Sequence, residues 1–390
     1  MAKSKQIISM KYIYIFLFQL ILSFNSINSL TDLYVGYPDL KNNYPKVSQA
    51  IEACASINPK SESDRITIHI FPGTYREEII IKTPYITLIN DDVSKGDVIL
   101  TWYYAIGFSY YSIDSNGIYN EDNARSKTSK GEATMWGATG QIQNTATDFK
   151  AKNIIFENSF NHYMTNEEIE DGVVLSDGTE KIVRTMSSDV RQRAHNARAA
   201  AITIDADRAE FYNCKFYSSQ DTLYTGGKKG YFKKCKIEGN TDYIFGKGDY
   251  VFDECVLSFY GFVDLAFNGV ITAAREQTES HGYLFYNCKI VANPDLMVST
   301  GNLGRPWRQT AVVLFYNTIV EKKDTISDEG WESMACDPTE ANFMEYNTTL
   351  PDGTALDVLK RKGRILSDDE AKDISVKGYL EDWTPTYLLE

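Results

Sequence analysis

Short apolar segments recur through the middle of the chain at intervals of about 20 residues, with polar turns between them. Each copy begins with aromatic or apolar residues, passes through Asn or Cys, and ends on another apolar residue. The copies are FKAKNIIFENS from Phe149, AEFYNCKFYSS from Ala209, GYFKKCKIEGN from Gly230, YVFDECVLSFY from Tyr250, YLFYNCKIVAN from Tyr283 and VLFYNTIVEKK from Val313. Such a repeat predicts a solenoid, in which each unit buries its apolar face against its neighbours.

The repeat favours a parallel β-helix over other solenoids. The LxxLxL pattern of leucine-rich repeats is absent, and each unit reads as short strands rich in Val, Ile, Phe and Tyr between Gly, Asn and Asp turns. Successive coils of a β-helix stack about 4.8 Å apart, so residues one period apart should lie above one another. Because the repeat is continuous, we predict one domain, although a length of 390 residues alone would suggest two or three.

Four of the six cysteines occupy the same position of the repeat: Cys214, Cys235, Cys255 and Cys288. Stacked Cα atoms about 5 Å apart are within disulfide range, so we predict a Cys214–Cys235 bridge, with stacked free thiols as the alternative. No CxxC pair or histidine cluster accompanies them, which argues against a zinc site.

The N-terminus has the pattern of a secretory signal peptide. Three lysines precede or border the apolar run Tyr12–Leu22, and small polar residues follow, ending near Ser29. We therefore expect residues 1–29 to be removed, residues 30–390 to form the β-helix domain, and the protein to be secreted and extracellular. An N-terminal anchor helix is the alternative, although the apolar run is short for a membrane span.

The formal net charge of −13 argues against binding to nucleic acid or to an anionic membrane surface, and favours a neutral polymer as partner. Lys228–Lys229 and Lys233–Lys234 form a small basic patch, which we interpret as solvated surface in preference to a site for free carboxylates. Asn347, in Asn-Thr-Thr, is a candidate N-glycosylation acceptor.

Two aspartates share the spacing of the cysteines. Asp221, in SSQDTLYTGG, and Asp242, in NTDYIFGKG, have the same separation in the chain as Cys214 and Cys235, so we expect them side by side on adjacent coils. Arg198 precedes Gln220 by close to one coil and should lie near the same column, whereas spacing alone does not place Arg305, in LGRPWRQ. Neighbouring carboxylates with an arginine beside one can serve as nucleophile or base and as general acid. The alternative is a pair of aspartates that cap turns.

Several segments resemble the signature blocks of the pectinesterase family. The strongest are QDTLYTG, DYIFGKG and GRPW, and the weaker ones are GTYREE, ATMWGATG and DRAEFYNC, all in the family's order between Asp32 and Met334. The resemblance implies a right-handed single-stranded parallel β-helix of the pectin-lyase-like kind. In detail it is closest to secreted enzymes of bacteria and plant-feeding insects.

The resemblance also implies roles for individual residues. Asp242 would attack the ester carbonyl of a methylated galacturonate, and Gln220 would donate a hydrogen bond to the oxyanion. Asp221 would protonate the departing methanol and then activate water. Arg305 would pair with Asp242 and keep it charged.

Three aromatic residues would line the cleft: Trp307, Tyr243 and Tyr224, with Trp307 stacking on sugar. The resemblance implies methyl-esterified pectin (homogalacturonan) as the substrate and no metal or organic cofactor. We expect the protein to be a monomer.

The chain departs from the family pattern at one position. The family carries a second glutamine before the DRAxFYNC block, and here RAAAITIDADRAEFYNC places Arg198 at that position. An arginine is a stronger donor to an oxyanion than an amide. It could also pair with Asp221 or Asp242, so altered specificity, an altered pH optimum and loss of activity all remain open.

Three alternatives belong to other function classes. A pectin-active glycosidase also uses two carboxylates, and a lyase uses an acidic calcium site, but a Gln beside the acid favours ester chemistry. An esterase for another acyl group, and a secreted β-helix that binds pectin without turnover, are the other two.

Overall fold

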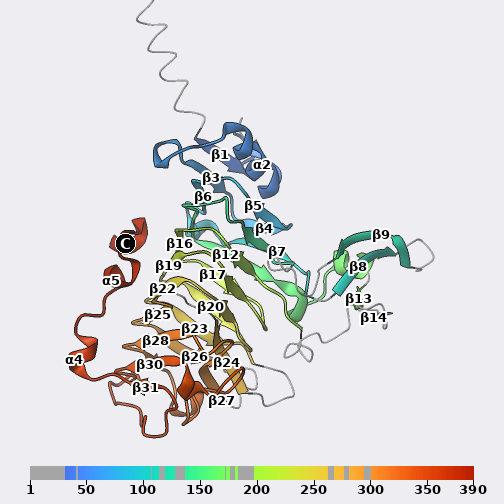
Figure 1. Ribbon diagram of the computed structural model, residues 1–390. Helices are drawn as coiled ribbons and strands as arrows, with labels where there is room; N and C mark the ends of the chain where they lie inside the picture. Colours follow the sequence, from blue (N-terminus) through green and yellow to red (C-terminus); the bar gives the residue numbers. More distant parts are fainter. Residues whose placement is uncertain are drawn as a thin grey trace, which may run out of the picture.

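The protein folds into a parallel β-helix, as the repeat predicts (Figure 1). The computed structural model describes residues 31–40, 43–106, 108–113, 119–127, 137–171, 173–175, 181–182, 197–261, 268–275, 281–293 and 300–390. The predicted signal peptide lies outside these residues. Three parallel sheets run the length of the described coils, and each full coil gives one strand to each sheet. No helix in this described part is long and apolar enough to cross a membrane.

The three parallel sheets have twelve, seven and eight strands. The twelve-stranded sheet contains β1 (Asp32–Val35), β2 (Asn43–Tyr44), β3 (Ile66–Ile70), β6 (Ile86–Ile89), β11 (Lys150–Lys152), β16 (Ala209–Tyr212), β19 (Lys229–Lys233), β22 (Asp249–Asp253), β25 (Tyr283–Tyr286), β28 (Val312–Tyr316), β30 (Asn342–Tyr346) and β31 (Arg364–Ile365). The seven-stranded sheet contains β5 (Ile79–Ile81), β10 (Gly140–Ile142), β15 (Ile202–Ile204), β18 (Leu223–Thr225), β21 (Ile244–Gly246), β24 (Asn268–Ala274) and β27 (Thr300–Pro306). The eight-stranded sheet contains β4 (Gly73–Arg76), β7 (Val98–Trp102), β12 (Ile154–Asn158), β17 (Lys215–Tyr217), β20 (Lys236–Gly239), β23 (Val256–Phe259), β26 (Lys289–Ala292) and β29 (Ile319–Val320).

A smaller antiparallel sheet projects to one side of the coils (Figure 1). It is formed by β8 (Phe108–Ile113), β9 (Tyr119–Lys127), β13 (Val173–Leu175) and β14 (Lys181–Ile182). The repeat pattern does not extend into these segments and did not predict this sheet.

The interior is built from side chains that stack from coil to coil. Phe211, Phe232, Phe252, Phe285 and Phe315 form one such column. Consecutive rings are nearly parallel, with centroids 4.6, 4.8, 4.7 and 4.4 Å apart along the column. These separations match the distance between hydrogen-bonded strands, so the column follows from the register of the sheet.

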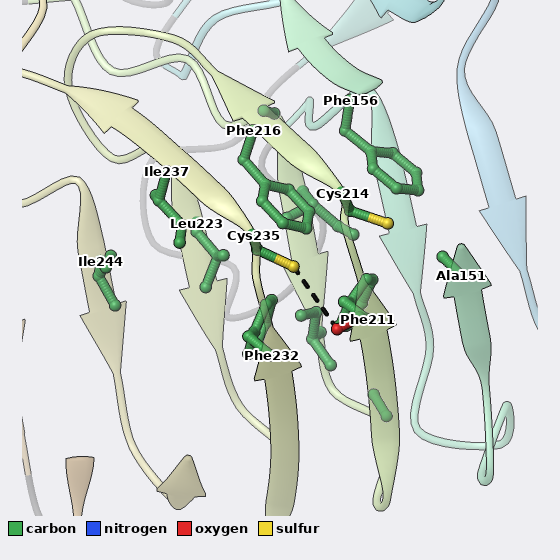
Figure 2. Close-up of a cluster of buried hydrophobic side chains, with 14 of the residues drawn as sticks. Ala151, Phe156, Phe211, Cys214, Phe216, Leu223, Phe232, Cys235, Ile237 and Ile244 are labelled. Carbon is green, nitrogen blue, oxygen red and sulfur yellow. Dashed lines mark hydrogen bonds between the residues drawn. The ribbon is translucent and has the colours of Figure 1, made fainter. Parts of the chain in front are cut away.

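The cysteines form a second interior column, and the predicted disulfide is not formed. Cys214 and Cys235 are buried free thiols, as are Cys255 and Cys288. Figure 2 shows the first two on neighbouring coils among apolar side chains, with separate sulfur atoms. The Cys235 Sγ atom contacts the Phe211 carbonyl oxygen at 3.5 Å. Each thiol thus packs as a small apolar side chain, and the alternative of stacked free thiols is the one that holds.

The residue before each of these cysteines turns the chain in the left-handed conformation. Asn213 and Asn287 have φ values of 50° and 54° there, and Asn317 and Asn347 continue the column with a φ value of 52° each. The Asn347 Nδ2 atom donates to the Asn317 Oδ1 atom at 2.9 Å, so it takes part in an asparagine ladder. Asparagine tolerates positive φ better than most residues, which explains its place in the repeat. N-glycosylation at Asn347 stays a prediction.

Helix α2 (Val47–Ile57) contacts β1, β3 and β5 at the N-terminal end of the coils. Its apolar residues Val47, Ala50, Ile51 and Cys54 follow helical spacing and are buried. The helix ends at Asn58, whose left-handed backbone (φ 59°) lets its N–H bond the carbonyl of Cys54.

The C-terminal segment returns along the twelve-stranded sheet (Figure 1). It contains α4 (Asp368–Ala371) and α5 (Val376–Leu380), and a further helix, α3 (Asn166–Asp171), precedes β13. The Lys229 Nζ atom bonds Asp382 at 2.6 Å, and the Lys234 Nζ atom bonds the Glu390 carbonyl at 2.9 Å. The predicted basic patch therefore anchors the C-terminal segment.

Candidate active site

The two aspartates lie at the start of neighbouring strands of the seven-stranded sheet. Leu223 of β18 pairs with Ile244 of β21, and Asp221 and Asp242 each stand two positions before these partners. The Asp221 N–H donates to the Thr241 carbonyl at 3.0 Å, which joins the two coils at the aspartates. Their φ values of 61° and 50° are left-handed, a conformation that costs energy outside glycine and is concentrated at functional sites.

Arg305 of β27 holds Asp242 through two hydrogen bonds. The Nε atom donates to Oδ1 at 2.8 Å, and an NH2 group donates to Oδ2 at 2.7 Å. This bidentate geometry fixes both the position and the orientation of the carboxylate. The remaining nitrogen of the guanidinium, Nη1, donates to the Glu332 Oε1 atom at 3.0 Å. Arg305 therefore lies between two carboxylates.

The neighbouring groups act differently on the pKa values of the two buried aspartates. Both carboxyls are almost fully buried, with 6% of Asp221 and 5% of Asp242 exposed. Burial and the nearby charge of Asp242 raise the pKa of Asp221 well above its usual range, against the opposing positive charges of Arg198 and Arg305. Burial also raises the pKa of Asp242, but its hydrogen bonds and charge interaction with Arg305 limit the rise. Asp242 is thus the carboxyl that ionises first, and Asp221 is the one that retains a proton.

Gln220 and Arg198 occupy one column beside the aspartates. Arg198 pairs with Gln220, and Gln220 pairs with Thr241, each as an isolated parallel bridge. Both side chains are half-buried. Two hydrogen-bond donors from neighbouring coils therefore lie next to Asp221.

Two of the three predicted aromatic residues lie on the outer face of the seven-stranded sheet. Tyr224 packs against Phe245 at a centroid distance of 5.2 Å, and Phe245 lies 6.1 Å from the partly exposed Trp307. Phe245 was not predicted, although it follows Tyr224 at the same interval that separates the aspartates.

The structure contradicts the prediction that Tyr243 lines the cleft. It is fully buried in the interior core and packs edge-on against Phe259, with ring centroids 5.8 Å apart, so it does not line a cleft. The left-handed turn at Asp242 directs the next side chain inward. Glu332 was missed altogether, because its segment pairs with β27 only through isolated bridges, Gly301–Ile326 and Gly304–Trp331, and has no copy in the repeat.

Comparison with known proteins identifies the family. The Pectinesterase family profile matches residues 117–382, which is more than half of the chain. The chain belongs to the pectinesterase family. This is a family of carboxylic ester hydrolases, in accord with the resemblance of the three signature blocks.

Curated relatives agree with this assignment. Probable pectinesterase A from Aspergillus fumigatus is 30% identical over 239 residues, which cover 60% of this chain and 68% of the relative. Pectinesterase 2 from Olea europaea is 37% identical over 188 residues, which cover 47% of this chain and 48% of the relative. The chain thus spans between about half and two thirds of the length of these relatives.

The fold has solved counterparts as well. The pectin methylesterase PemA from Erwinia chrysanthemi superposes with a TM-score of 0.66 at 22% identity, over 91% of this chain and 98% of that one. The fold is the right-handed parallel β-helix of these proteins, as predicted. Among the described residues no group of His, Cys, Asp and Glu has the arrangement of a metal site.

Proposed function

We propose that this protein hydrolyses the methyl esters of pectin, releasing methanol and leaving free galacturonate carboxylates. The observation that carries the proposal is the Arg305–Asp242 ion pair, with N–O distances of 2.7 and 2.8 Å, beside an aspartate that retains its proton. A nucleophile held ionised and a neighbouring general acid are the two groups that ester cleavage needs. The relatives described above are named as pectinesterases, in agreement with this reaction.

In the first half of the reaction, an Asp242 carboxylate oxygen attacks the ester carbonyl carbon, and the carbonyl electrons move onto its oxygen. The Gln220 amide donates to this oxyanion, and so does Arg198 from the neighbouring position. The tetrahedral intermediate then collapses. The methoxy oxygen leaves with its bonding electrons, takes the proton from Asp221 and departs as methanol, leaving an anhydride between Asp242 and the galacturonate.

In the second half, Asp221 is a carboxylate and acts as a base. It accepts a proton from water as the water oxygen attacks the galacturonate carbon of the anhydride. Collapse of the second tetrahedral intermediate returns the bonding electrons to Asp242, frees the galacturonic acid and leaves Asp221 protonated, as at the start. Arg305 balances the charge of Asp242 before attack and after release.

The partly exposed Trp307, packed on the buried rings of Phe245 and Tyr224, would hold the polymer across the sheet. Aromatic rings bind the apolar faces of pyranoses, and this cluster lies on the same face of the sheet as Arg305, because Tyr224, Phe245, Ala273 and Arg305 are register partners.

The test is methanol release from highly methylated pectin by the purified protein and by its Asp242→Asn variant. We expect release by the wild-type protein, a loss of at least about a thousandfold in the variant, and no loss for the exposed control Asp373→Asn. Reducing ends or unsaturated products without methanol would instead identify a glycosidase or a lyase. Undiminished methanol release by Asp242→Asn would remove Asp242 as the nucleophile.

We further propose that the mature protein is a secreted monomeric domain that begins near residue 30. N-terminal sequencing of the protein recovered from a culture medium tests the cleavage, and its sedimentation tests the monomer. An intact N-terminus on a membrane-bound protein would contradict secretion.

A further inference from the structure

The second carboxylate that binds Arg305 is itself only partly buried. Arg305 Nη1 donates to Glu332 Oε1 at 3.0 Å, and 36% of the Glu332 side chain is exposed. Among the described residues, Glu332 is the only carboxylate besides Asp242 that Arg305 contacts. Ion pairs of exposed side chains contribute little on their own, because each side chain loses conformational freedom on pairing. Glu332 therefore needs further support to hold the guanidinium in place.

Asn302 supplies this support from the interior. It lies on β27, the strand that also carries Arg305, and only 6% of it is exposed. Its Nδ2 atom donates to Glu332 Oε2 at 3.2 Å. Both oxygens of the Glu332 carboxylate are thus engaged, one by Asn302 and the other by Arg305. The carboxylate is held between a buried amide and the guanidinium.

Ser327 fixes the orientation of the Asn302 amide. The Ser327 hydroxyl donates to Asn302 Oδ1 at 2.6 Å and accepts the Gly330 N–H at 3.1 Å. The amide oxygen therefore faces a hydroxyl donor, and the amide nitrogen faces a carboxylate, as the donor and acceptor groups require. We refer to Ser327, Asn302 and Glu332 as the support chain of Arg305.

The backbone around the support chain is tied to β27. The Ser327 N–H bonds the Gly301 carbonyl at 2.8 Å, and the Glu332 N–H bonds the Gly304 carbonyl at 3.0 Å. A pocket of about 440 Å³ opens beside these residues, and its lining includes Asn302, Ser327 and Glu332. Without the bond from Asn302, the Glu332 carboxylate would have room to turn into this pocket, away from the guanidinium.

We propose that Asn302 is a positioning residue, which holds Glu332 against Arg305 while Asp242 is bound in the anhydride. The inference rests on the proposed function. Before attack, Asp242 itself binds the guanidinium through two hydrogen bonds. In the anhydride Asp242 carries no charge, so Glu332 is the described carboxylate that remains to pair with Arg305. When water releases the galacturonic acid, negative charge returns to Asp242, and a guanidinium already in place stabilises it.

The test measures methanol release from highly methylated pectin by the full chain and by Asn302→Leu, which keeps the approximate size of the side chain but cannot donate. The support chain acts after methanol has left. We therefore expect kcat to fall by about tenfold, the cost of one hydrogen bond to a charged group, and kcat/KM to change by less than about twofold. Rapid-quench measurements should show a burst of about one methanol per protein before the slower steady state. Ser327→Ala should lower kcat in the same way by about threefold.

A double-mutant cycle separates positioning from a general effect on the fold. Glu332→Ala should reproduce the fall in kcat at the pH of maximal activity. If Asn302 acts through Glu332, Asn302→Leu should lower kcat no further in the Glu332→Ala background, because residues that act through one contact are not additive. Asn342→Leu and Ser333→Ala, at exposed side chains, are the matched controls.

The outcomes separate this inference from the proposed function. Equal falls of kcat in both backgrounds would refute it, since Asn302 would then act on the fold. A fall in kcat/KM without a burst would place the effect before the anhydride and would refute it as well. Unchanged kinetics of Asn302→Leu, with methanol released by the unmutated chain, would overturn the inference and leave the proposed function intact. No methanol from the unmutated chain would overturn the proposed function, and the inference with it.

Discussion

Arg305 and Asp242 are joined by two parallel hydrogen bonds, although 63 residues separate them in the sequence. The pair links β27 to the turn before β21, two strands away in the sheet. Because both carboxylate oxygens are engaged, the carboxylate cannot rotate freely, and the guanidinium fixes its charge and direction together.

Replacing Arg305 by lysine tests this bidentate geometry. Lysine keeps the positive charge but cannot form two parallel hydrogen bonds, so we expect kcat to fall roughly ten- to a hundredfold, the cost of one charged hydrogen bond. Methanol release under saturating pectin measures it. Arg308→Lys, at a nearby exposed arginine, is the control. An unchanged kcat would mean that a positive charge beside Asp242 is sufficient for catalysis without the bidentate geometry.

Glu332 shifts the acid limb of the pH profile, which burial and Arg305 chiefly determine. Its negative charge raises the pKa of Asp242, the group that must be ionised to attack. Activity should therefore fall as the pH drops through that pKa, and Glu332→Gln should shift this fall to lower pH. The profile of kcat/KM between pH 3 and pH 7, chosen around the usual carboxyl pKa, measures the shift. A move of the acid limb to higher pH would contradict the assignment. Glu329→Gln, at a neighbouring carboxylate, provides the control.

Arg198 affects the alkaline limb of the same pH profile. Its positive charge lowers the otherwise raised pKa of Asp221, which must be protonated to release methanol. Activity should decline as the pH rises through this pKa. Arg198→Gln restores the residue type usual in the family and should move the alkaline decline to higher pH. As the oxyanion loses a charged donor, kcat should also fall by up to about tenfold. A variant with the wild-type profile would place Arg198 outside the site.

The spacing of the sequence predicts the positions of some of these residues and not of others. One regular coil separates Asp221 from Asp242, and the observed pairing Leu223–Ile244 spans the same interval of the chain. The next intervals in this sheet are longer, since Ile244 pairs with Thr272 and Thr272 with Gly304. Loops of irregular length lie between those strands, so spacing could not place Arg305 against Asp242, and only the GRPW resemblance indicated its role.

Side-chain direction was the harder inference. A strand alternates inward and outward side chains, but the phase of the alternation depends on the turn before it. The left-handed backbone at Asp242 set that phase and put Tyr243 in the core. The cysteine column was predicted for the same reason as the aspartate pair, whereas stacking alone could not decide between a disulfide and free thiols.

Asp221→Asn should stabilise the fold while abolishing turnover. The pKa of Asp221 is raised in the folded state, so the folded protein binds this proton more tightly than the unfolded chain. Ionisation then destabilises the fold as the pH rises above the ordinary aspartate pKa of about 3.9, and the cost is absent below it. An uncharged asparagine removes this cost, so Tm at pH 7 should rise by on the order of 2 °C, with little change near pH 3. Scanning calorimetry at both pH values measures it, with Asp373→Asn as the exposed control. A lower Tm at pH 7 would mean that the charge of Asp221 is stabilised by its surroundings, contrary to the burial and repulsion that raise its pKa.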